Sequence, residues 1–163
     1  MQLAQIVKIV GCIAPVDTGG AAKLGCHVNM SKYNHVAFLI YTGVIGNDCV
    51  VTVLAGTDAL GTGGVAMGFN YRISTGGVPL IAELAIAALT TVAAGGYTIA
   101  NATDDNEIMV IEMDASELVA PTTNYYVGVN LSAAAASLEC VIALCMEPRY
   151  MAAPNLMPSA VVA

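Results

Sequence analysis

Two histidines and a neighbouring cysteine are the first residues whose types are suited to binding a metal ion. His27 follows Cys26 directly in the sequence, and His35 is the second of the two histidines. Adjacent residues in a β-strand point to opposite faces, so Cys26 and His27 cannot easily share one ion. We therefore interpret both histidines as surface or edge residues and expect no metal site.

A group of acidic residues offers a second candidate metal site. Asp104, Asp105 and Glu107 bring carboxylate oxygens together, and calcium prefers oxygen ligands. The segment lacks the spacing of an EF-hand loop, in which a glycine and a glutamate occupy fixed positions. We interpret it as a solvated turn.

Catalytic patterns are absent from the sequence. No Gly-x-Ser-x-Gly nucleophile motif occurs, and no pair of carboxylates is singled out for hydrolysis. The glycine-rich stretch 56–64 lacks the lysine of a phosphate-binding loop, and the alternating segment Val65–Ser74 that follows favours a strand over a helix. We expect no catalytic residues, no cofactor and no enzymatic activity.

The cysteines leave two alternatives open. None of them forms a Cys-x-x-Cys pair typical of zinc or redox sites. They are either small core residues of a protein kept in a reducing compartment, or they form disulfides between subunits after release into an oxidising medium. Because the count is odd, at least one thiol is unpaired within the chain. The candidates are Cys12, Cys26, Cys49, Cys140 and Cys145.

The composition indicates a chain whose surface meets other protein. Of its 163 residues, 10% are charged and 57% are hydrophobic, whereas about 25% charged residues are typical of soluble domains. The net charge of −7 and the scattered basic residues argue against nucleic-acid binding. The longest weakly polar run, Gly76–Tyr97, is interrupted by Glu83 and is a poor membrane span, and residues 1–5 do not resemble a signal peptide. We expect burial in an assembly, with neither nucleic acid nor membrane as a partner.

The stretch Asn34–Asp58 predicts the central element of the fold. Two apolar runs rich in β-branched residues, Val36–Val44 and Cys49–Gly56, flank the turn formers Gly46-Asn47-Asp48. This pattern predicts two strands joined as a hairpin. Both strands are apolar on both faces, so we expect both faces to be covered, either by the segment Leu80–Ala94 or by a neighbouring molecule.

The rest of the chain predicts an all-β domain over residues 1–146. Seven to nine short strands are expected in total, which is typical of an antiparallel β-sandwich or barrel. A loop is expected over Ala14–Gly20, and Leu80–Ala94 is ambiguous between helix and strand, with strand favoured. A helical turn near 114–119 is predicted because Asp114 and Glu117 form a capping-box pattern. The other expected strands are Leu3–Ile13, Lys23–Met30, Val65–Ser74, Tyr97–Asn101, Glu107–Met113, Asn124–Leu131 and Leu138–Met146.

Residues 147–163 predict an extended C-terminal arm. The segment contains three prolines and no hydrophobic periodicity. An apolar, proline-containing arm is typical of a segment that lies on another surface. The candidate partner-binding residues are Glu147, Pro148, Arg149, Tyr150, Pro154, Leu156 and Pro158.

The order of these segments resembles a group of small virion proteins of tailed bacteriophages. The resemblance rests on the opening Ile-Val strand, Asn34–Phe38, the Val-Thr-Val strand ending in Ala-Gly-Thr-Asp, Phe69–Arg72, Glu107–Leu118 and the closing Glu147–Tyr150 with Pro154 and Pro158–Ala160. These proteins are similar to head decoration, or cement, proteins. The Ala-rich Leu80–Ala94 segment and the cysteine count depart from the pattern.

The resemblance implies a non-enzymatic protein on the outside of the capsid, made in the cytoplasm of the bacterial host. Its implied partners are the major capsid protein and further copies of itself, as a trimer. Two alternatives stay open: a tail or head–tail connector component, and a small carbohydrate-binding β-sandwich. The carbohydrate-binding alternative needs exposed aromatic side chains, and the chain has no Trp and two Phe.

Overall fold

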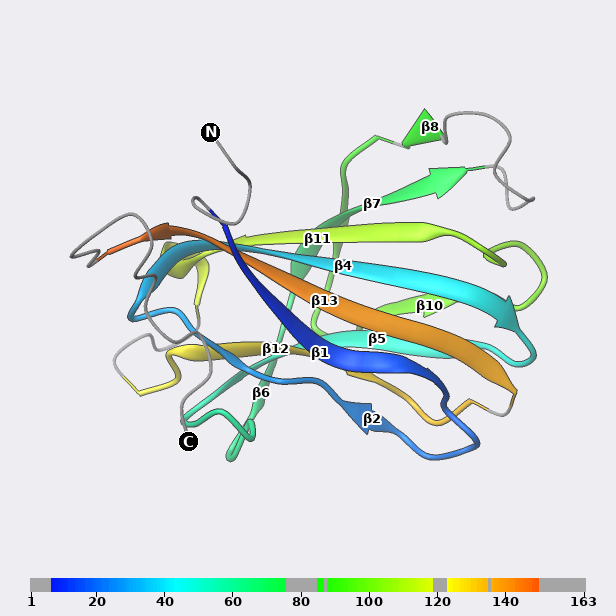
Figure 1. The fold of residues 1–163 in the computed structure, drawn as a ribbon, viewed down its shortest axis with the longest axis horizontal. Helices are drawn as coiled ribbons and strands as arrows, with labels where there is room; N and C mark the ends of the chain where they lie inside the picture. Colours follow the sequence, from blue (N-terminus) through cyan, green and yellow to red (C-terminus); the bar gives the residue numbers. More distant parts are fainter. Residues whose placement is uncertain (1–6, 76–84, 87, 119–122, 135, 150–163) are drawn as a thin grey trace.

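We describe the protein from a computed structural model, for residues 7–75, 85–86, 88–118, 123–134 and 136–149. These residues form two antiparallel sheets that lie as two layers of a sandwich (Figure 1). The predicted all-β class is confirmed, and of the two predicted architectures the protein has the open sandwich and not the closed barrel. Within these ranges, no helix has the length and apolar character needed to cross a membrane.

Among the described residues, sheet A has seven strands and sheet B has six. In sheet A the order is β1 (Lys8–Asp17), β13 (Ser137–Pro148), β4 (Tyr33–Ile45), β11 (Ile108–Asp114), β7 (Phe69–Thr75) and β8 (Ala85–Ile86), with β9 (Thr90–Val92) also paired to β7. In sheet B the order is β10 (Tyr97–Ile99), β5 (Cys49–Gly56), β12 (Tyr126–Leu131) and β2 (Lys23–Leu24), while β3 (Val28–Asn29) pairs with β12 and β6 (Val65–Met67) pairs with β5.

The core lies between the two sheets and follows the alternation of side chains along each strand. Phe38 and Ile40 of β4 are fully buried on the inner side of sheet A. Val51 and Val53 of β5 are fully buried on the inner side of sheet B. Each strand therefore contributes one face to a common core.

The predicted hairpin Asn34–Asp58 is wrong in its pairing, although both strands are present. Strand β4 pairs with β13 and β11, whereas β5 pairs with β12, β10 and β6. The connection at 46–48 therefore crosses from one sheet to the other. Polar groups at and beside this connection form hydrogen bonds with other segments. Ile45 N–H donates to Asp105 Oδ1 (2.7 Å), and Asn101 N–H donates to Asp48 Oδ1 (2.9 Å). Placing the two strands in opposite sheets lets the apolar face of each meet the other across the core.

Two strand boundaries also differ from the prediction. Strand β1 continues to Asp17, through part of the predicted loop Ala14–Gly20, with irregular register between Gly11 and Val16. An edge strand tolerates Pro15 because its free side needs no ladder hydrogen bond. At the other end of the chain, β13 continues through Pro148, into the predicted arm.

The predicted helical turn is confirmed as a short 3-10 helix, η2 (Ala115–Glu117). The predicted capping box of Asp114 and Glu117 is present, and in it the backbone N–H of Asp114 donates to Glu117 Oε2 at 2.7 Å. Within the predicted strand Leu80–Ala94, residues 85–86 and 90–92 are strands, while 80–84 and 87 lie outside the described residues.

Candidate functional site

The outer side of sheet A carries large apolar side chains that face solvent. Tyr41 on β4 and Leu138 on β13 are 41% and 50% exposed, and Ile9 on β1 is 51% exposed. Monomeric proteins rarely expose contiguous apolar patches larger than a few hundred Å². We call this surface the exposed apolar face, and it consists of Ile9, Leu39, Tyr41, Val110, Leu138 and Ile142.

The strand register brings these residues together. Ile142 lies opposite Leu39, and Leu39 in turn lies opposite Val110 of β11. Residues opposite each other on antiparallel strands project from the same side of the sheet. The apolar side chains therefore form one continuous surface across β1, β13, β4 and β11.

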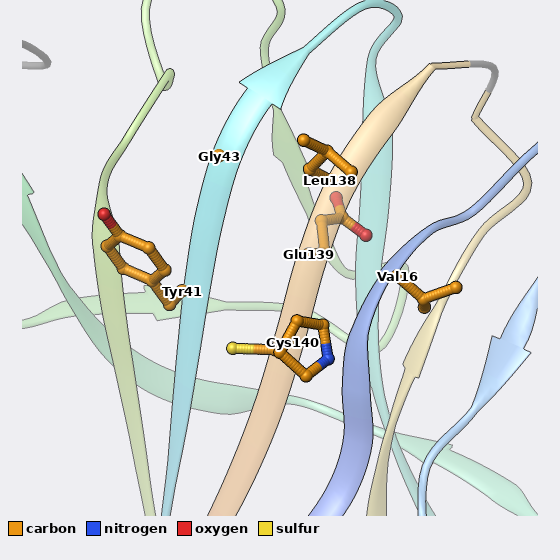
Figure 2. Close-up of a pocket in the computed structure, with 7 residues that line it drawn as sticks. Val16, Tyr41, Gly43, Leu138, Glu139 and Cys140 are labelled. Atoms are coloured by element: carbon orange, nitrogen blue, oxygen red, sulfur yellow. The ribbon is translucent and has the colours of Figure 1, made fainter.

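A groove of about 320 Å³ runs along one end of this face (Figure 2). Gly43 leaves it open: a Cβ at this position would lie 3.0 Å from Leu138 Cβ. Tyr41 forms one side of the groove and Val16 of β1 lies toward the other (Figure 2). The lining residues are Pro15, Val16, Tyr41, Gly43, Leu138, Glu139 and Cys140.

At the other end of sheet A lies a polar depression of about 550 Å³. It is lined by Asn34, Asp114, Ala115, Ser116, Glu147 and Arg149. Two of the predicted partner-binding residues, Glu147 and Arg149, thus meet the η2 region here. The depression places charged side chains of both signs at one end of sheet A.

His35 is tied to the acidic residues beside this depression. Its Nδ1 lies 2.7 Å from Asp114 Oδ1, and its Nε2 lies 3.6 Å from Glu112 Oε1. Burial lowers the pKa of His35, but the hydrogen bond to Asp114 and the charges of Asp114 and Glu112 outweigh it and raise the pKa above its ordinary value. When His35 is protonated, its charge offsets part of the negative charge of Asp114 and Glu112.

The predicted arm begins as part of the sheet. Pro148 lies opposite Tyr33, and the N–H of Arg149 donates to Lys32 O at 2.9 Å. Glu147 has a φ of 53°, a left-handed conformation that is uncommon for a residue with a side chain. The other four predicted partner-binding residues, Tyr150, Pro154, Leu156 and Pro158, lie outside the described residues.

The cysteines fall into three environments. Cys12 and Cys26 form a disulfide within the chain, so both alternatives, free core residues and disulfides between subunits, are wrong for these two. Cys49 and Cys145 are buried free thiols, which agrees with the first alternative, and burial raises the pKa of each to about 12. Cys140 is a half-buried free thiol that lines the groove.

His27 is not a surface or edge histidine, and that prediction is wrong. Its side chain is fully buried, with Nδ1 3.2 Å from Gly25 O and Nε2 without a hydrogen-bond partner. A Cβ on Gly128 would lie 2.7 Å from the imidazole, and one on Gly61 would clash with it. The imidazole of His27 therefore lies between the glycine-rich stretch 56–64 and β12. The sequence pattern did not reveal this role of the glycines.

The predicted solvated turn at Asp104, Asp105 and Glu107 is wrong in part. Asp104 and Asp105 are half-buried, and Glu107 is buried with its Oε2 accepting a hydrogen bond from the Ser74 hydroxyl. Asp104 Oδ2 accepts hydrogen bonds from Tyr97 and from the Ala100 N–H, so each carboxylate serves a separate structural contact. Across the described ranges, no three His, Cys, Asp or Glu side chains form a group able to hold a metal ion.

Comparison of the chain with protein-family models, with curated proteins and with solved structures gives no match. The functional argument therefore depends on the surfaces of the molecule. One part of the exposed apolar face, the outward position of Leu39, could be predicted from the sequence. The run Phe38-Leu39-Ile40 predicted a strand with apolar side chains on both sides, and Phe38 and Ile40 do face the core while Leu39 faces outward.

Proposed function

We propose that the protein is a non-enzymatic structural component of a bacteriophage virion that binds the outer surface of the capsid and its own neighbours, and so stabilises the head. The observation that carries this proposal is the exposed apolar face of sheet A. A solvent-facing sheet with this many apolar side chains is typical of a protein that works in contact with other protein. The resemblance seen in the sequence supplies the identity of that protein, the major capsid protein.

The polar end of sheet A is the part we assign to the capsid. Glu147 and Arg149 lie there, and the predicted arm leaves the sheet from this end. An arm and a polar depression that act in many copies give strong attachment even when each contact is weak. Each added copy contributes to the cohesion of the shell.

Binding to purified, expanded heads that lack decoration tests the proposal. The full-length protein should sediment with such heads and raise the temperature at which they release DNA. Arg149→Glu should weaken this binding, whereas Lys23→Glu, which makes the same charge change on β2 of sheet B, should leave it unchanged. Heads that bind neither the wild-type protein nor any variant would refute the proposal.

Copy number separates decoration from the tail or connector alternative. A decoration protein is present in hundreds of copies per particle, whereas a connector ring has about a dozen or fewer. Quantitative mass spectrometry of intact virions, scaled to the major capsid protein, measures this number. A dozen copies or fewer would replace the decoration role with the connector role.

A further inference from the structure

We infer that residues 57–64 form a lid over His27 on the outer side of sheet B, and that this lid opens when His27 takes up a proton. The lid is a feature of the single molecule and works whether or not the protein binds a capsid. Three features of the molecule support it: the position of His27, the contacts of its two ring nitrogens, and the way in which the lid is held.

His27 lies on the outer side of sheet B, away from the core. A Cβ on Gly128 of β12 would touch its imidazole, whereas the neighbours of Gly128 along the strand, Val127 and Val129, belong to the core between the sheets. Since successive residues of a strand point to opposite faces, the imidazole packs on the outer face of β12. It is nevertheless fully buried, because the lid lies over it so closely that a Cβ on Gly61 would clash with the ring.

The two ring nitrogens of His27 have unequal surroundings. Nδ1 lies 3.2 Å from Gly25 O, so we assign the proton of the neutral ring to Nδ1, which donates to this carbonyl. Nε2 is buried and has no hydrogen-bond partner among the described residues. Protonation of Nε2 under the closed lid would therefore create a charged N–H group without an acceptor, which is strongly unfavourable in a buried site.

The groups that face His27 do little to stabilise its charged form. On the lid, the charge of Asp58 attracts the protonated ring but offsets only part of the effect of burial, which is the larger and lowers the pKa of His27. On β12 the titratable residue is Tyr126, whose hydroxyl accepts a hydrogen bond from the Asn29 amide. In the segment of His27 itself, Cys26 is held in a disulfide and does not titrate. The ring is therefore neutral under the closed lid at neutral pH.

The lid is bonded mainly within itself. Asp58 Oδ1 accepts hydrogen bonds from the N–H groups of Leu60 (2.9 Å) and Thr62 (3.0 Å), so the turn keeps its shape without help from the sheet. The lid is joined to the histidine by the hydrogen bond from the His27 N–H to Ala59 O, at 3.3 Å. The lid can therefore move away from His27 as one unit, with its internal hydrogen bonds intact.

The sign of the pH dependence follows from the two environments of the ring. When the lid is open, water reaches the imidazole and its pKa returns to the ordinary value of 6.5. Below this pH the open state binds more protons than the closed state, so a falling pH favours opening. Between pH 6.5 and the lower pKa of the closed state, the open fraction should rise by up to about tenfold per pH unit. Because the ring lies outside the core, the two sheets stay packed while the lid opens.

Amide hydrogen exchange followed by NMR over a pH series tests the lid, after correction for the pH dependence of exchange in an unstructured chain. From pH 7 to pH 5, the corrected exchange of the His27 N–H, which bonds to the lid, should rise by about tenfold. The nuclear Overhauser contacts between the Gly61 α-protons and the His27 ring should weaken in parallel. The amides of Phe38 and Ile111 in sheet A should keep their protection.

Two variants identify the histidine that is responsible. His27→Asn keeps a side-chain N–H that can donate to Gly25 O but cannot titrate, so the same amide at position 27 should exchange independently of pH after correction. His35→Gln is the matched control, because it removes the other histidine and should leave the transition unchanged. Circular dichroism checks that each variant is folded, and the wild-type protein and His35→Gln are sufficient for the test if His27→Asn does not fold.

Three results would overturn the inference. The first is a His27 N–H in the wild-type protein whose corrected exchange does not change with pH. The second is a loss of protection in sheet A together with the lid, which would indicate unfolding of the whole molecule. The third is a transition that persists in folded His27→Asn or disappears in His35→Gln. Binding to capsids is measured separately, and neither result depends on the other.

Discussion

The two histidines have opposite electrostatic environments. Burial lowers the pKa of His27, and the hydrogen bond to Gly25 and the charge of Asp58 offset only part of this effect. For His35, the contacts with Asp114 and Glu112 outweigh burial and raise the pKa. The two pKa values are thus shifted in opposite directions, each for an identifiable reason.

A proton NMR titration should separate the two histidines. The imidazole signal of His35 should titrate above the ordinary pKa of 6.5 and that of His27 below it. Accordingly, stability from His35 is fully present below pH 6.5 and is lost as the pH rises through its folded-state pKa. Stability from neutral His27 is present above pH 6.5 and is lost as the pH falls through its own folded-state pKa. His35→Gln assigns the signals, and two signals that titrate together near 6.5 would contradict the prediction.

The close approach of Gly128 to His27 predicts the cost of adding one methyl group. A Cβ at Gly128 would lie 2.7 Å from the imidazole, so Gly128→Ala should lower the free energy of unfolding by about 1–3 kcal/mol through overpacking. Gly95→Ala is the control, because nothing lies within 4 Å of its added Cβ. Urea unfolding of both variants measures the difference, and equal stability of the two would show that the site tolerates the methyl group.

At the scale of elements, the disulfide joins the two sheets at one edge. Cys12 lies on β1, the edge strand of sheet A, and Cys26 lies between β2 and β3, which pair with β12 in sheet B. The bond therefore links the edge strand of sheet A to the segment that pairs with β12 of sheet B.

Removing this disulfide should destabilise the protein measurably. The two cysteines are 14 residues apart, and closing a loop of about this size contributes roughly 3 kcal/mol to the free energy of unfolding. Dithiothreitol should lower the urea midpoint of the wild-type protein by a corresponding amount. The double variant Cys12→Ala, Cys26→Ala should have the lower midpoint with or without the reductant; a wild-type protein insensitive to reduction would refute the role of the bond.

For the whole molecule, acidic charge and apolar surface act in opposite directions on any contact between copies. The net charge of −7 opposes such contact, and the exposed apolar face favours it. Salt screens charge repulsion but leaves apolar contact intact.

Several features could be predicted from the sequence because they depend on local patterns. Alternating apolar residues are sufficient to predict strands such as Glu107–Met113, and the Asp114 and Glu117 spacing is sufficient to predict the turn at η2. Leu39 is apolar and lies between Phe38 and Ile40, so the sequence likewise predicted a strand that is apolar on both faces. These features follow from the period of a strand and the reach of a side chain along the chain.

Contacts between residues that are distant in the sequence were decided only by the tertiary structure. The two strands that flank Gly46-Asn47-Asp48 could be predicted from the sequence. Their assignment to different sheets could not, because the same turn residues suit a hairpin within one sheet and a connection between two sheets. The burial of His27 depends on Gly61 and Gly128, and the disulfide depends on the meeting of two sheet edges. The sequence alone determined an all-β chain with sparse charge. Only the packing of the two sheets decided which apolar side chains fill the core and which remain on the exposed apolar face, because burial depends on what lies across the core.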